Sequence, residues 1–253
     1  MSMDEIVIQA ESARPCFAGE QPLPTLNCLI TPANQICMVG DHIPIMTCYL
    51  RMLAGVDKPC AGEVTLLGQR SSVMDADQRR ALRLQIAFVA RGGPLLSVLS
   101  GINNVKLPAQ YHELGSGEEI EQRTRELIAE LEYLADHDVL PAYMTGLQRR
   151  HLAIARALML QPQMLFVDDP FEGLDRYARG MISTYLDFLV QEKGLAVVTS
   201  NANLAFVKEN ADMIIYCGRE GMLPFDGWES FVGSHNSDVV DFLAGRRKST
   251  FFG

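Results

Sequence analysis

The chain has 253 residues, 48% of them hydrophobic and 21% charged, a composition typical of a globular protein with a full buried core. A net charge of -9 and a pI of about 5.1 disfavour a nucleic-acid-binding role. No apolar run reaches the roughly 18 to 20 residues that a membrane-spanning helix requires. The acidic N-terminus, MSMDEIVIQAE, lacks the pattern of a signal peptide. We therefore expect a cytoplasmic protein that does not bind nucleic acid.

The six cysteines do not form a metal or redox motif, because no two of them are three residues apart. Most have apolar neighbours, so we expect small, buried hydrophobic side chains. They are Cys16, Cys28, Cys37, Cys48, Cys60 and Cys217.

The first third of the chain alternates short apolar runs with turns. Strands are expected over Glu5–Gln9, Leu26–Ile30 and Gln35–Val39, the last of them buried. A helix over Cys48–Gly55 and a turn over Lys58–Val64 follow. Further along, Ile86–Val89 is expected to be a strand, and Gly117–Leu134 an amphipathic helix with a solvated charged face.

The stretch from Met144 to Asp175 has the most regular pattern. A polar turn over Met144–Gln148 opens a helix, which Gln161-Pro162 ends, and a buried strand over Met164–Val167 leads to two aspartates. A last core strand is expected over Lys193–Ser200. A helix over Asn203–Ala211 and a strand over Met213–Tyr216 come after it.

This stretch resembles the signature helix, Walker B strand and D-loop of ABC-transporter ATPases. The residues that carry the likeness are AIARAL at Ala153–Leu158 and Gly173-Leu174-Asp175. The resemblance implies an α/β, ABC-type P-loop NTPase fold: a mainly parallel core sheet flanked by helices, an N-terminal antiparallel β region and an inserted helical subdomain at about 95–155. It also implies a single nucleotide-binding domain over 1–245. The basic and aromatic tail, 246–253, is either a frayed terminus or a clasp on a partner.

The phosphate-binding loop departs from the family pattern GxxxxGK[ST]. Gly40 and Thr47 are kept, but Met46 stands in the lysine position and Ile45 in the glycine position, after Pro44, which has no N–H. Losing a charged hydrogen bond and two or three backbone donors costs about 3 to 7 kcal/mol. This weakens binding by roughly a hundredfold to a hundred-thousandfold. We expect weak or no ATP binding in this chain's own Walker A site.

Three positions that contact the metal, the attacking water or the γ-phosphate in the family are also changed. Arg91 stands at the Q-loop glutamine, Asp169 at the catalytic glutamate and Ser200 at the switch histidine. By the resemblance, Thr47 and Asp168 would hold Mg²⁺, and only if nucleotide binds.

The family's dimer-facing positions are better preserved. Thr145, Gly146 and Gln148 match the signature turn, whereas Leu147 replaces its second glycine; Asp175 matches the D-loop. For stacking on the nucleotide base, the nearest aromatic candidate is Phe17.

Our leading hypothesis is a non-hydrolysing subunit that pairs head to tail with an active ABC ATPase and seats a membrane permease on Arg91–Val105. It would lie at the inner face of the cell membrane. The C-terminal Val239–Gly245, V-x-x-F-L-x-G, resembles ATPases of mammalian-cell-entry-type lipid transporters. One alternative is a divergent active ATPase in which Arg91 or Arg51 replaces the lysine. Another is a non-enzymatic regulator or scaffold.

Overall fold

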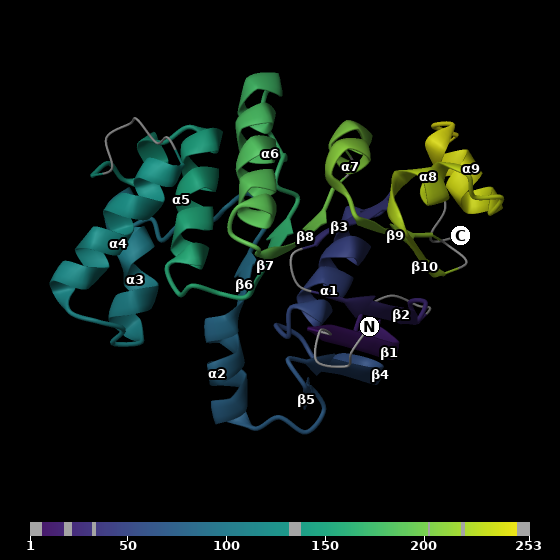
Figure 1. Ribbon diagram of the computed structural model, residues 1–253, viewed down its shortest axis with the longest axis horizontal. Coiled ribbons are helices and arrows are strands. Elements are labelled where there is room, and N and C mark those ends of the chain that lie inside the picture. The colour runs from purple at the N-terminus through teal and green to yellow at the C-terminus, as the bar shows by residue number, and fades with distance from the viewer. Residues whose placement is uncertain are drawn as a thin grey trace.

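A six-stranded sheet in the order β10-β9-β3-β8-β7-β6 forms the centre of the computed structural model (Figure 1). All its neighbouring strands are parallel except β10, which is antiparallel to β9. The structure describes residues 7–17, 22–31, 34–131, 138–201, 203–218 and 221–246. The strands are β3 (Gln35–Gly40), β6 (Ile86–Val89), β7 (Met164–Asp168), β8 (Ala196–Ser200), β9 (Met213–Cys217) and β10 (Met222–Phe225).

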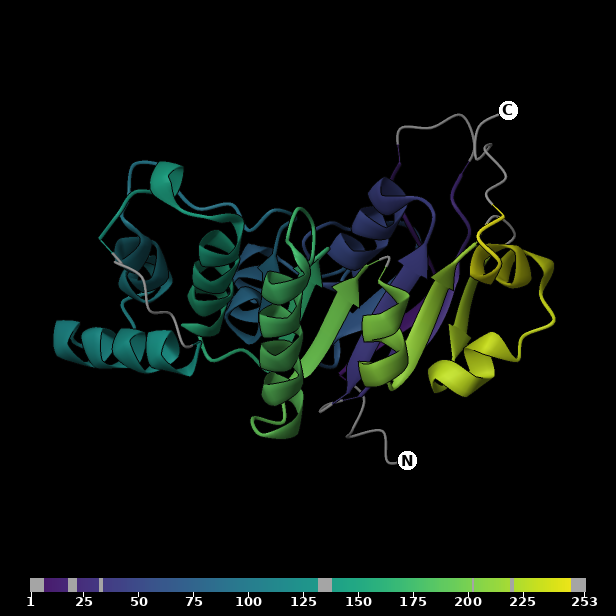
Figure 2. The same ribbon diagram turned by 90° about the horizontal axis from the view of Figure 1, so that it is seen from above.

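Every residue of β3, β7 and β8 is buried, which explains their unbroken apolar runs, because helices cover both faces of the sheet. Ile36 and Met38 of β3 belong to the same apolar cluster as α1 (Ile43–Leu53). Cys37 and Val39 belong to the opposite cluster, with α6 (Arg176–Gln191) and α7 (Leu204–Asn210). Figure 2 shows these helices on opposite sides of the strands.

An antiparallel sheet in the order β2-β1-β4-β5 contains the N-terminal strands. Its strands are β1 (Ile8–Pro15), β2 (Leu26–Ile30), β4 (Pro59–Leu66) and β5 (Gln69–Arg70). The prediction of a turn over Lys58–Val64 is therefore wrong, because residues 59–64 belong to β4. The proline and glycine of this segment, Pro59 and Gly62, lie instead in an irregular part of the β1–β4 pairing. The register shifts there, and Gly62 takes a φ of +70°. The first strand also lies further along the chain than predicted, and residues 5 and 6 are outside the described residues.

The helices α3, α4 and α5 gather on one side of the molecule (Figures 1 and 2). Together with α2, α8, α9 and a short 3-10 helix, η2, they complete the fold. The bounds are α2 (Ala76–Gln85), α3 (Gly101–Tyr111), α4 (Gly117–Glu130), η2 (Pro141–Tyr143), α5 (Gly146–Leu158), α8 (Gly227–Val232) and α9 (Ser237–Leu243). None of the described helices is long and apolar enough to cross a membrane.

Bounds were predicted from the sequence for four of the helices, α1, α4, α5 and α7, and for none of the others, and their positions agree with the structure better than their ends do. Helix α1 begins at Ile43, five residues before the predicted start, and α5 ends at Leu158 instead of at Gln161. Helix α4 begins as predicted, because Ser116 and Glu119 form a capping box, and ends at Glu130. The last residues of the predicted helix, from 132 on, lie outside the described residues.

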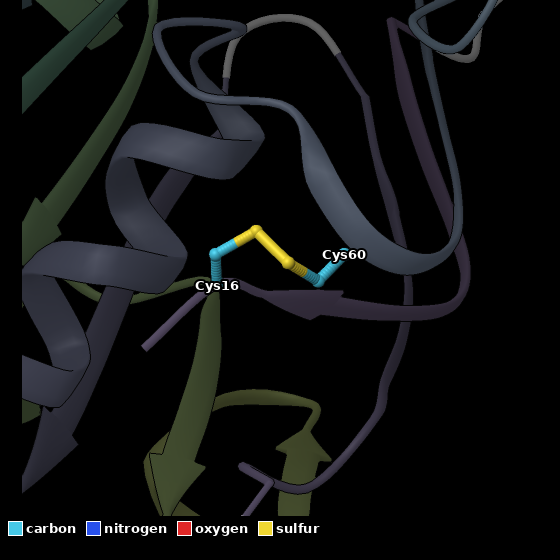
Figure 3. Close-up of a disulfide and its surroundings, with 2 residues drawn as sticks. All are labelled: Cys16 and Cys60. Carbon is cyan, nitrogen blue, oxygen red and sulfur yellow. A yellow bond between two sulfur atoms is a disulfide. The ribbon is translucent and has the colours of Figure 1, made fainter. Parts of the chain in front are cut away.

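Two of the cysteines depart from the prediction that all six are buried. Cys16 and Cys60 are exposed and form a disulfide, with their Cα atoms 5.1 Å apart (Figure 3). Each of these cysteines comes directly after a proline, Cys16 after Pro15 and Cys60 after Pro59. The two prolines are partners in the β1–β4 pairing, and neither has an N–H to donate across the strands. Three others are buried as predicted, and burial raises the thiol pKa of two of them, Cys28 and Cys37, to about 12.

Candidate functional site

The predicted phosphate-binding loop begins at Gly40, the last residue of β3. A Cβ atom at this position would lie 2.7 Å from the carbonyl oxygen of Cys217 in the neighbouring strand β9. Gly40 is therefore needed for the close approach of two strands, whether or not phosphate binds.

The rest of the loop is folded as the first turn of α1. The backbone N–H groups of Ile45 and Met46 both donate to the carbonyl of His42 at 3.1 Å, and Pro44 lacks an N–H. A phosphate-binding loop needs such N–H groups to point inward at the anion. The side chain of Met46 is fully buried in the apolar cluster between α1 and the sheet. In this helical conformation, the segment therefore does not fit the phosphates of a nucleoside triphosphate.

Asp168, at the end of β7, is the centre of a buried hydrogen-bond cluster. Its carboxylate accepts from the hydroxyl of Thr47 at 2.9 and 3.1 Å and from the hydroxyl of Ser200 at 2.6 Å. Ser200 lies opposite Asp168 in the parallel β7–β8 pairing. The structure thus brings together the two residues predicted to hold Mg²⁺ and the residue in the switch-histidine position.

Thr47 and Ser200 are thus bound to the same carboxylate. Among the described residues, no group of three or more His, Cys, Asp or Glu side chains is arranged to hold a metal ion. A hydroxyl that donates its hydrogen keeps two lone pairs, so Thr47 and Asp168 could hold a cation together without losing the hydrogen bond between them.

Asp169 follows in a left-handed conformation, with a φ of +44°. Its N–H donates to the carbonyl of Ser200 at 3.0 Å. One oxygen of its carboxylate lies 3.4 Å from the guanidinium of Arg91, and the Nε of Arg91 lies 2.8 Å from Glu172. Burial raises the pKa of Asp169, and the charge of Arg91 opposes that shift. The Q-loop position and the catalytic-glutamate position are therefore joined by an ion pair.

A second arginine, Arg150 of α5, was not predicted to belong to this site. It is almost completely buried, and its guanidinium donates to the carbonyl oxygens of Asp169 at 3.0 Å and Glu172 at 3.4 Å. The sequence does carry a signal for it. Arg150 is four residues before Ile154 and eight before Leu158, so it lies on the buried face of the helix, where a charge requires polar partners.

The signature turn and the D-loop form helix N-termini. Thr145 caps α5, and its side chain and that of Gln148 form a reciprocal capping box. Asp175 caps α6 by accepting from the N–H of Ala178 at 2.8 Å. The two turns touch, since a Cβ added at Gly146 would lie 3.2 Å from Leu174.

Two further features lie apart from this cluster. Phe17 is partly buried against the apolar cluster that contains α1. A cavity of about 900 Å³ lies between α4, α5 and α6, where Tyr177, Tyr185 and Phe188 are among its lining residues. It does not include the Gly40–Thr47 loop.

The family model described as "ABC transporter" matches residues 47–172 of this chain. The "Uncharacterized ABC transporter ATP-binding protein YbbA" of Escherichia coli K12 is 33% identical over 70% of this chain and 78% of its own length. The lipoprotein-releasing system ATP-binding protein LolD of Chromohalobacter salexigens is 29% identical over 80% of this chain and 88% of its own.

Solved structures have the same architecture. The dimeric ATP-binding cassette MJ0796, in a post-hydrolysis state bound to ADP and Pi, superimposes with a TM-score of 0.75 at 26% identity, over 83% of this chain and 94% of its own. CbiO1 of Clostridium perfringens shares the fold, with a TM-score of 0.79 at 18% identity over 96% of each chain. The fold and the site define an ABC-type nucleotide-binding domain. The chain belongs to the ABC transporter family and is an ATP-binding subunit of that family.

Proposed function

We propose that this chain is a non-hydrolysing ABC subunit that pairs with an active ATPase and a membrane permease. The observation that carries the proposal is the first turn of α1, where the N–H groups of Ile45 and Met46 are already bonded to His42. Met46, in the lysine position, is buried in the core and carries no charge. ATP binding in this loop would require the turn to unfold and would still lack the cation that reaches the phosphates.

The ion pair at Asp169 supports the same proposal, because Arg91 neutralises the carboxylate that stands in the catalytic position. Asp168 is bonded by Thr47 and Ser200, and Asp169 is paired with Arg91. In the active ATPase alternative, Arg91 or Arg51 would replace the missing lysine. Arg91 is engaged by Asp169 and Glu172, while Arg51 forms two hydrogen bonds with Asp57, at 2.6 and 2.9 Å. Neither arginine is free for phosphate, so the inactive reading is favoured.

The residues at the family's dimer-facing positions fit their proposed role better than the phosphate-binding loop fits ATP. In this account Thr145, Gly146, Gln148 and Asp175 complete the ATP site of the partner, in a head-to-tail dimer, while the helical region over about 95–155 acts as the inserted subdomain. The dimeric state of the ADP-bound relative supports such pairing. Exposed Leu96 and Val98, within Arg91–Val105, offer apolar contacts to a permease.

Lipid is the cargo class that we propose. Its support is the C-terminal resemblance over Val239–Gly245 and the likeness to a lipoprotein-releasing ATPase subunit. An iron-import ATPase subunit, FbpC of Rhizobium etli, is 28% identical over 92% of this chain and 65% of its own length. Cargo must therefore be tested independently of the proposed pairing.

The test is co-expression with neighbouring genes, purification of the complex and an ATPase assay with and without this chain. We expect a permease and a second, intact ATPase to co-purify, with full activity only in the mixed complex. Activity of this chain alone, abolished by Asp169→Asn, would establish the divergent-enzyme alternative. Purification with no permease would favour the regulator alternative.

Within that complex, Leu147→Gly tests the signature turn. Leu147 packs partly against the core, and glycine in its place restores the family pattern and lets the backbone approach phosphate more closely. We expect the partner's ATPase rate to rise. Leu114→Gly, at a half-exposed leucine after α3, is the matched control and should leave the rate unchanged. A sharp fall with Leu147→Gly alone would contradict the pairing.

A further inference from the structure

A cavity of about 900 Å³ opens where α4, α5 and α6 meet, at the boundary between the helical region and the central sheet (Figure 1). It lies on the face of the sheet that α6 covers, whereas the Gly40–Thr47 loop leads to α1 on the opposite face (Figure 2). Small-molecule sites usually measure roughly 300 to 1,000 Å³. The cavity is therefore large enough for a small organic ligand, and its lining contains none of the described residues assigned above to nucleotide.

One stripe of α6 gives the cavity an aromatic wall. Tyr177, Met181, Tyr185 and Phe188 are spaced by three or four residues, so they lie on the same face of the helix. The rings of Tyr185 and Phe188 are stacked, with their centroids 6.0 Å apart and their planes at 24°. Tyr177 is 74% exposed, so most of its ring is open to a ligand. Flat aromatic faces beside a polarisable thioether suit a planar aromatic ligand.

A glycine keeps this cavity wide. Gly180 of α6 is one of the lining residues, and a Cβ atom added there would have nothing within 4 Å. Glycine within a helix destabilises it relative to alanine. No packing contact in the described part of the chain requires the glycine, so the helix loses stability here while the cavity gains room.

The most buried polar groups of the lining carry no charge at neutral pH. His151 is 3% exposed, and burial lowers the pKa of its imidazole to about 4. Tyr185 is 6% exposed, and burial raises the pKa of its hydroxyl, which therefore keeps its proton. The less buried Glu130 is paired with Lys193 at 2.7 Å. An uncharged ligand can therefore enter the cavity without burying an unpaired charge.

The hydroxyl of Tyr185 adds a polar requirement. It has no hydrogen-bond partner among the described residues. A buried hydroxyl without a partner is costly, and a ligand that accepts its hydrogen bond removes that cost. The hydroxyl oxygen is covered in this conformation, so the bond requires a small turn of the ring toward the cavity.

We propose that the cavity between α4, α5 and α6 binds an uncharged, planar aromatic molecule that carries a hydrogen-bond acceptor. The rings of the ligand lie against Tyr177 and Phe188, and its acceptor takes the hydrogen bond of Tyr185. The site needs no nucleotide and no partner subunit. It is independent of the proposed function, so either proposal can fail without the other.

The first test measures the binding of naphthamide, an uncharged aromatic carboxamide, to the full chain by NMR titration. Tyr177→Ala should weaken binding by about two- to tenfold, the effect of losing one aromatic contact. Tyr143→Ala removes a tyrosine that is 80% exposed and does not line the cavity, and it is the matched control. Because both side chains are exposed, neither change should affect folding. No binding to the unmodified chain, or equal binding by the two variants, would overturn the site.

The second test compares naphthamide with methylnaphthalene, which has the same rings and no strong acceptor. Tyr185→Phe should weaken binding of the amide by about two- to tenfold and leave binding of the hydrocarbon unchanged. Equal effects on the two probes would overturn the hydrogen bond to Tyr185.

A third probe tests the charge of the ligand. The anion naphthoate should bind no more tightly than naphthamide, although Arg176 lines the cavity, because that arginine is exposed and water screens its charge. Tighter binding of the anion, lost in Arg176→Gln, would overturn the assignment to an uncharged ligand.

Discussion

Gly40 shows, at the scale of single residues, that a motif residue can be required for packing. Its missing Cβ leaves room for the Cys217 carbonyl 2.7 Å away, so Gly40→Ala must push β3 and β9 apart. We expect a loss of about 1 to 3 kcal/mol in the free energy of unfolding, measured in urea. Gly180→Ala is the matched control. It lies within α6 with nothing within 4 Å of the added atom, and should stabilise by about 0.5 to 1 kcal/mol. Equal effects of the two variants would contradict this account.

His151 supplies a second prediction at this scale. Burial in α5 lowers its pKa from 6.5 to about 4. Between these values the unfolded chain binds a proton that the folded chain does not, so stability falls as the pH falls from about 6.5 to 4. The expected contribution is on the order of 3 kcal/mol. Unfolding measured across this range should show a shallower loss in His151→Leu than in the unmodified chain. Identical slopes would show that His151 titrates normally.

Residue patterns predicted part of the site and missed the rest for a physical reason. The family resemblance placed Thr47 and Asp168 together as Mg²⁺ ligands and Ser200 in the switch-histidine position, and the structure joins the three side chains by hydrogen bonds. The ion pairs of Arg91 depend on the left-handed turn at Asp169, which nothing in the local sequence specifies, since aspartate only tolerates that conformation. The bonding of Ile45 and Met46 to His42 likewise depends on where α1 begins.

At the scale of elements, the disulfide makes the clearest prediction. Cys16 and Cys60 are 44 residues apart and close a loop that contains β2, β3 and α1. The chain-entropy relation gives about 4 kcal/mol for a loop of this length. Cys60→Ser should therefore lower the free energy of unfolding by about 2 to 4 kcal/mol under non-reducing conditions. The same change is expected when reductant is added to the unmodified chain.

Two further measurements serve as controls for the disulfide prediction. Thiol titration of the denatured, unreduced chain should find four free thiols out of six. Cys48→Ser, at a free and half-buried cysteine, should change stability much less than Cys60→Ser. Six free thiols, or a Cys60→Ser variant as stable as the unmodified chain in the absence of reductant, would exclude the bond.

At the scale of the whole molecule, the architecture was predicted through the family resemblance, and the unbroken apolar runs of a buried parallel sheet located the strands β3, β7 and β8. The antiparallel region was predicted less well. Its strand β4 contains Pro59 and Gly62, residues typical of turns, and only the long-range pairing with β1 makes it a strand. Tertiary pairing of this kind cannot be seen in a local pattern.

The central claim concerns the whole chain, namely that its own nucleotide site is closed by its own side chains. Titration calorimetry of the isolated chain with ATP and Mg²⁺ tests this most directly, with an intact ABC ATPase as the positive control. We predict a dissociation constant of about 1 mM or weaker, because the lysine and several backbone donors are lost. Micromolar binding, weakened by Thr47→Val, would contradict the claim and show that α1 opens to receive nucleotide.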